Sequence, residues 1–117
     1  MSQTRLLCLA GACLIVAGLF TLGGLPGAGR LFLPPWDKVA HVSVYASLAL
    51  LLWFGTGARA PLFVAAAVIA VGALDELHQA GLPGRTADVA DLAADACGVA
   101  LAFFLLRSRK FATKGKP

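Results

Sequence analysis

Four apolar runs, separated by short polar or glycine- and proline-rich breaks, dominate the chain. They predict helices over residues 6–25, 38–54, 60–79 and 87–106. A spanning helix needs about 20 predominantly apolar residues, so the pattern predicts four transmembrane helices. Pro61 suits a first helical turn, where no backbone N–H donor is needed. We expect the carboxylate of Asp37 to cap the second helix by accepting free amide protons.

The first run also has the short basic start of a signal peptide. Its apolar part is longer than a typical signal core and as long as a spanning helix requires. We therefore interpret it as a retained transmembrane helix. The predicted fold class is all-α: an integral membrane four-helix bundle with up-down connections and short loops.

Composition supports this interpretation, because 59% of the 117 residues are hydrophobic and only 14% are charged. A soluble domain of this length carries far more charge. The chain is too short for two domains, so residues 1–117 are predicted to form one. Residues 108–117 form a basic tail that we expect to be disordered.

The basic residues give an orientation. The formal net charge is +4, and half of the ten Lys and Arg residues lie in the C-terminal tail. The N-terminus, the loop at Arg59 and the tail together carry seven, whereas the opposite side carries Arg30, Lys38 and Arg85. The positive-inside rule then predicts a multi-pass protein of the bacterial inner membrane with both termini in the cytoplasm. No nucleic-acid-binding motif accompanies the charge, so nucleic acid is not an expected partner.

The three cysteines, Cys8, Cys13 and Cys97, all fall inside apolar runs. No CxxC or Cys/His spacing is present, which argues against a disulfide framework and a zinc site. We expect buried structural thiols.

Residues 75–98 form the most polar stretch of the chain and hold five of its six acidic residues. At 1.5 Å per residue, Asp75 and Asp91 each lie about 24 Å from the terminus side of the membrane. His41 lies at about 21 Å and Asp95 at about 18 Å by the same measure. Polar groups from three helices are therefore expected in one layer just below the outer surface.

A carboxylate in hydrocarbon costs several kcal/mol unless it is paired or protonated, so such residues face the bundle interior or a water-filled cavity. We predict a pocket open to the outer leaflet. Its candidate ligand-binding residues are Asp37, Lys38, His41, Tyr45, Asp75, Gln79, Arg85, Asp91 and Asp95. Glu76 points about a quarter-turn away from Asp75 and Gln79.

Over residues 37–98 the chain resembles the VanZ-like membrane proteins. That family shows Asp-Lys, then His, then Tyr before a leucine-rich helix, followed by Asp-Glu-x-x-Gln, Pro-Gly-Arg, and Asp-x-x-x-Asn with Gly three positions later. The matching residues here are Asp37, Lys38, His41, Tyr45, Asp75, Glu76, Gln79, Pro83, Gly84, Arg85, Asp91 and Gly98. Where the family commonly has Asn, this chain has Asp95.

The family takes its name from a protein linked to resistance to the glycopeptide antibiotic teicoplanin. The resemblance therefore implies a role in the bacterial cell envelope. The leading hypothesis is that the protein recognises a lipid-linked cell-wall component or a lipophilic glycopeptide. The resemblance carries no settled biochemical activity.

Two alternatives stay open. The chain could be an intramembrane enzyme acting on a lipid headgroup, with acid–base candidates His41, Asp75, Glu76 and Asp91. It could also be a non-catalytic bundle that serves a partner protein. The sequence does not decide whether the protein is an enzyme, and we assign no cofactor. Hard oxygen ligands would suit a divalent cation, but no ligand spacing identifies one, so no metal is assigned.

Overall fold

The computed structural model describes residues 1–114 and consists of four long helices joined by short segments. The helices are α1 (Gln3–Thr21), α2 (Trp36–Gly55), α3 (Pro61–Ala80) and α4 (Val89–Lys114), with a short 3-10 turn η1 (Ala28–Arg30) between α1 and α2. Each long helix contains a span of 19 to 21 residues that is apolar and long enough to cross a membrane. The predicted all-α class with four candidate transmembrane helices is confirmed.

Local signals set most of the helix boundaries. The Ser2 hydroxyl accepts a hydrogen bond from the Arg5 amide at the start of α1 (3.4 Å). Pro61 is the first residue of α3, as predicted. At the start of α4, the Asp88 carboxylate accepts from the Ala90 amide (2.8 Å), which is the bond an N-capping aspartate makes.

Two sequence-based predictions about helix ends are wrong. Asp37 does not cap α2, because the helix begins one residue earlier and Asp37 lies in its first turn beside Lys38. The basic tail, expected to be disordered from residue 108, continues α4 as far as Lys114. Residues 115–117, the end of that predicted tail, lie outside the described residues.

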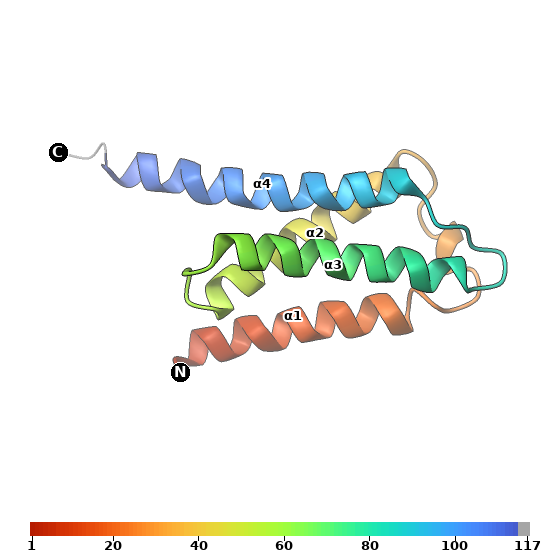
Figure 1. The fold of residues 1–117 in the computed structure, drawn as a ribbon, viewed down its shortest axis with the longest axis horizontal. Helices are drawn as coiled ribbons and strands as arrows, with labels where there is room; N and C mark the ends of the chain where they lie inside the picture. The colour runs from red at the N-terminus through yellow and green to blue at the C-terminus, as the bar shows by residue number, and fades with distance from the viewer. Residues whose placement is uncertain (115–117) are drawn as a thin grey trace.

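The helices run alternately in opposite directions, so both termini lie at one end and the longer loops at the other (Figure 1). Helices α2 and α3 form the middle of the molecule, and α1 and α4 lie on opposite sides of them (Figure 1). In the described part of the chain no Cα atom of α1 lies within 8 Å of one in α4. We call the two ends the terminus end and the loop end.

The closest approach is between α2 and α4. A Cβ on Gly98 would lie 2.5 Å from the Val42 carbonyl oxygen and 2.9 Å from the Ala46 amide nitrogen. Only glycine therefore allows these two backbones to meet. Below this crossing, Leu48 of α2, Val64 and Val68 of α3 and Ala102 of α4 form a fully buried apolar core.

Helix α1 contributes little to the core, since Ala12 is its only buried residue. Large side chains such as Leu7 and Leu14 are exposed, as expected of a helix that presents its surface to lipid.

The three cysteines also lie on helix surfaces that the bundle covers partly or not at all. All three are free, and Cys13 and Cys97 are exposed, so the expected burial of the thiols is wrong.

Candidate functional site: a buried polar layer

All six acidic side chains of the protein gather at the loop end. They form, with five other polar residues, a connected cluster that we call the polar layer. Its members are Asp37, Lys38, His41, Tyr45, Asp75, Glu76, Gln79, Arg85, Asp88, Asp91 and Asp95. These residues come from α2, α3, the loop that precedes α4, and α4. All nine candidate ligand-binding residues named from the sequence lie in this layer, which also contains Glu76 and Asp88.

Lys38 links α2 to the start of α4. Its ammonium donates to Asp88 Oδ2 (2.9 Å) and to Asp91 Oδ1, and it lies 3.1 Å from Asp37 Oδ2. The hydrogen bond from Lys38 lowers the pKa of the Asp88 carboxyl below its usual range. Lys38 is thus the main counter-charge of the layer, and it is committed to three carboxylates.

His41 and Asp95 form the floor of the layer. His41 Nδ1 lies 2.7 Å from Oδ1 of Asp95, whose side chain is fully buried. The His41 ring is parallel to the buried Tyr45 ring, with centroids 6.1 Å apart. A Cβ on Gly72 would lie 2.6 Å from Asp95 Oδ2, so glycine at this position in α3 makes the space that Asp95 occupies.

Asp75, Gln79 and Arg85 form a second arm. Gln79 donates to Asp75 Oδ2 (3.0 Å), and Arg85 donates to Gln79 Oε1 (2.5 Å). Arg85 also donates to the Gly23 carbonyl (3.4 Å), which ties the loop before α4 to the end of α1. The guanidinium is therefore held by uncharged acceptors, whereas the lysine is held by carboxylates.

Glu76 reaches the layer even though its helical position points away from Asp75 and Gln79. Its Oε2 accepts from the backbone amide of Asp88 (2.7 Å), so it joins α3 to the start of α4. Its Oε1 is buried and has no hydrogen-bond partner among the described residues. The sequence pattern makes Glu76 an acid–base candidate and does not place it among the ligand-binding residues.

Exposure rises steadily across the layer. The Asp95 side chain is fully buried, Asp91 and His41 are 14% and 18% exposed, and Lys38 and Asp88 are 33% and 47% exposed. The layer is therefore accessible from the Lys38 and Asp88 side and closed at Asp95. The other histidine, His78, lies against Phe20 of α1 with ring centroids 5.3 Å apart.

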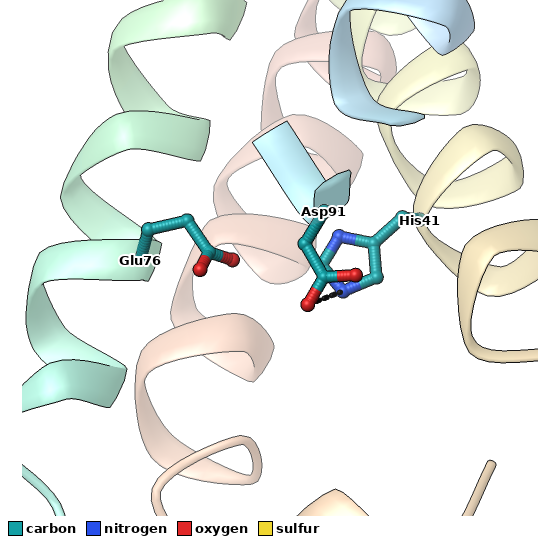
Figure 2. A group of neighbouring side chains, drawn as sticks. All are labelled: His41, Glu76 and Asp91. Carbon is teal, nitrogen blue, oxygen red and sulfur yellow. Dashed lines mark ion pairs between the residues drawn. The ribbon is translucent and has the colours of Figure 1, made fainter. Parts of the chain in front are cut away.

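Three potential metal ligands meet in the layer, although the sequence assigned none. His41, Glu76 and Asp91 each offer a ligand atom, and these atoms lie within 4.8 Å of one another. Figure 2 shows the three side chains pointing toward one another from three different helices. The dashed line marks His41 Nε2 and Asp91 Oδ2, which are 3.7 Å apart.

The charge of the layer restricts its chemistry. Its six carboxyl groups face two fixed cations, Lys38 and Arg85, which leaves a formal excess of four negative charges when all are ionised and His41 is neutral. Such a site attracts amines, hydroxyl donors and metal ions, and it repels a bare phosphate. The arrangement suits ligand binding and proton transfer, with His41 as the one imidazole of the layer.

The fold and the layer define a class: a multi-pass helical membrane protein with a buried acidic cluster at one end of its bundle. The family model described as VanZ/LLP1 matches residues 9–110, and the chain belongs to this family. Comparison with curated proteins and with solved structures gave no match. The resemblance found over residues 37–98 is thereby confirmed and extended to most of the chain.

Proposed function

We propose that this VanZ-family membrane protein recognises the polar head of a lipid-linked cell-wall component or of a lipophilic glycopeptide. Both kinds of molecule carry a lipid tail that places hydroxyl and amine groups at the membrane surface. The observation that supports the proposal best is the polar layer itself. Buried carboxylates within a membrane domain are costly, and they persist where function requires them.

The proposed orientation has both termini in the cytoplasm and the loop end at the outer leaflet of the bacterial inner membrane. Arg5, Arg59, Arg107 and Arg109 lie toward the terminus end. The loop end carries Arg30, Lys38 and Arg85, of which Lys38 and Arg85 are engaged within the polar layer. This asymmetry supports the positive-inside assignment. A reporter that is active only in the cytoplasm, fused after Pro117, should be active; an inactive, stably expressed fusion would contradict the orientation.

Recognition would enter from the Lys38 and Asp88 side, where the layer is exposed. Asp91 and Arg85 offer a carboxylate and a guanidinium for hydroxyl and amine groups or for an anionic group, respectively. The excess of carboxylates favours a head that carries an amine. In this role the protein alters the access of the antibiotic to its target.

A resistance assay tests this proposal. Arg85→Ala and Asp91→Asn should each abolish the change in teicoplanin susceptibility that the wild-type chain confers on a host strain. Gly18→Ala, at a glycine of α1 where an added Cβ would lie in open space, serves as the control. Full resistance with both layer variants at wild-type protein level would refute the proposal.

The geometry of His41 favours a second candidate function, an intramembrane enzyme acting on a lipid headgroup. Asp95 holds Nδ1 of the imidazole, and Nε2 is directed toward Asp91, which is an arrangement suited to general acid–base catalysis. Purified protein incubated with envelope lipids would then change them, and His41→Ala would stop the change. Unchanged lipids after incubation with folded, monodisperse protein would exclude this candidate.

A further inference from the structure

The three side chains of Figure 2 present complementary ligand atoms at one point. Each has an atom that no hydrogen bond in the described structure uses: Nε2 of His41, Oδ2 of Asp91 and Oε1 of Glu76. We propose that His41, Glu76 and Asp91 form a binding site for one divalent metal ion, of the Zn²⁺ or Mn²⁺ type. This site is independent of which headgroup the protein recognises.

The spacing suits one ion. Metal–nitrogen and metal–oxygen bonds of about 2.0–2.6 Å place ligand atoms about 3–5 Å apart around a common centre. Ligand atoms that already lie within 4.8 Å of one another need only small side-chain movements to reach this geometry. The ligands come from α2, α3 and α4, so an ion would also join the three helices of the core.

The ligand set points to the class of ion. An imidazole nitrogen suits Zn²⁺ and other transition metals, whereas carboxylates alone suit Mg²⁺, Ca²⁺ and Mn²⁺. One imidazole with two carboxylates is a mixed set that Zn²⁺ and Mn²⁺ both accept. Three protein ligands leave further coordination positions free, as in sites where a metal ion binds water or a substrate.

Glu76 gives an independent reason to expect a ligand. Its side chain comes from a residue that is only 7% exposed, and Oε1 has no hydrogen-bond partner in the described part of the chain. A buried, unpaired carboxylate oxygen costs free energy that a bound cation would recover. The other oxygen of Glu76 is fixed by the Asp88 amide, which holds the carboxylate in place.

His41 is prepared for the same role by Asp95. Metal-bound histidines almost always donate their second ring N–H to a carboxylate or carbonyl, which fixes the tautomer and orients the ring. The bond between His41 Nδ1 and the fully buried Asp95 carboxylate is this arrangement, and it leaves Nε2 facing Asp91. Asp95 would thus act as a positioning residue for the metal site.

The charge balance allows an ion beside Lys38. The ammonium uses Oδ1 of Asp91 and leaves Oδ2 on the side of His41. A divalent cation would reduce the excess negative charge of the layer from four to two. It would also allow an acidic layer to hold an anionic headgroup; this last step rests on the proposed function, whereas binding of the ion does not.

Titration with MnCl₂ tests the proposal directly. The purified full-length chain in detergent is mixed with increasing MnCl₂, and free Mn²⁺ is measured by its electron paramagnetic resonance spectrum. Wild type should bind one Mn²⁺ per chain, and ZnCl₂ should displace it. Glu76→Gln should weaken binding about tenfold or more while keeping an oxygen that accepts from the Asp88 amide. His41→Gln should weaken Mn²⁺ binding to a similar extent.

His78→Gln is the matched control, because His78 lies on the same helix two residues from Glu76 but faces α1. It should bind Mn²⁺ as wild type does. Absence of saturable Mn²⁺ or Zn²⁺ binding by the wild type would overturn the proposal. So would unchanged binding by monodisperse Glu76→Gln and His41→Gln proteins. Because resistance is not the readout, this result is separate from the test of headgroup recognition.

Discussion

The two ends of the bundle bury opposite kinds of side chain. Toward the terminus end, Leu48, Val64, Val68 and Ala102 are fully buried in an apolar core. At the loop end the same three helices bury Asp95, Glu76 and other polar groups, several of which have an oxygen without a hydrogen-bond partner among residues 1–114. The first arrangement gains stability from packing, whereas the second loses stability to desolvation. The packed core therefore accounts for how the helices hold together, and the cost of the polar layer is our reason for proposing that it serves a ligand.

A cleft of about 410 Å³ at the terminus end differs from the polar layer in the residues that line it. Its lining is mostly apolar and consists of Leu50, Phe54, Leu105, Leu106, Ser108 and Arg109. Ligand sites combine apolar walls with several converging polar groups, and the loop end provides far more of these.

The largest expected effect comes from crowding the α2–α4 crossing. Gly98→Ala places a methyl group against the Val42 carbonyl, where only backbone movement could relieve the contact. We expect a loss of about 1–3 kcal/mol in unfolding free energy. Gly18→Ala, which adds the same methyl group in open space, should be neutral or stabilising by up to about 1 kcal/mol. Equal effects in detergent unfolding experiments would show that the crossing is not the tight contact of the fold.

Removing the central cation of the polar layer should have a smaller effect. Lys38→Met leaves Asp37, Asp88 and Asp91 without their shared ammonium. We expect a loss of about 1–2 kcal/mol, since a third of the lysine side chain is exposed. Added MnCl₂ should restore part of this loss by supplying positive charge. A variant as stable as wild type would mean that the carboxylates of the layer are not ionised together.

Asp95→Asn should separate stability from function. Asparagine keeps an oxygen for the His41 Nδ1–H and removes a potential charge from a fully buried site. The unfolding free energy should change by less than about 1 kcal/mol, and the variant should be at least as stable as wild type. Affinity for Mn²⁺ should fall about tenfold, because a weaker acceptor orients His41 less firmly. A large loss of stability with unchanged Mn²⁺ affinity would make Asp95 a structural residue.

The smallest effect is expected where α1 touches the terminus end. Arg5 Nε donates to the Gly55 carbonyl (3.1 Å) at the C-terminus of α2, where a positive charge is favourable. Arg5→Gln should cost about 0.5 kcal/mol in the same unfolding assay, with no change in Mn²⁺ binding. An effect as large as that of Gly98→Ala would mean that α1 contributes more to the bundle than its exposed surface suggests.

Much of this architecture can be read from sequence, because membrane-length apolar runs and helical periodicity are strong signals. Asp91, Asp95 and Gly98 lie on one side of α4, since they are spaced four and three residues apart, and all three lie against α2. The pairing of Gln79 with Asp75 follows from their four-residue separation in one helix. These features depend on local geometry, which the sequence determines.

What depends on three-dimensional contact could not be predicted. The position of Glu76 on its helix predicts a side chain that points away from Asp75 and Gln79. Its longer side chain nevertheless reaches the amide of Asp88 at the start of α4. The role of Asp88 as a cap required knowledge of where α4 begins. The meeting of His41, Glu76 and Asp91 depends on the relative positions of three helices, which no motif in the sequence encodes. Exposure of Cys13 and Cys97 similarly reflects which helix faces are left uncovered.

Thermal unfolding of the wild type and of Glu76→Gln, each with and without MnCl₂, tests the contrast between core and layer most directly. Without metal, Glu76→Gln should be as stable as wild type or more so, because it loses a buried charge. With Mn²⁺ at a hundred times its dissociation constant, wild type should gain about 2.7 kcal/mol and the variant little. A variant that is less stable than wild type, together with a wild type that does not respond to Mn²⁺, would contradict the account.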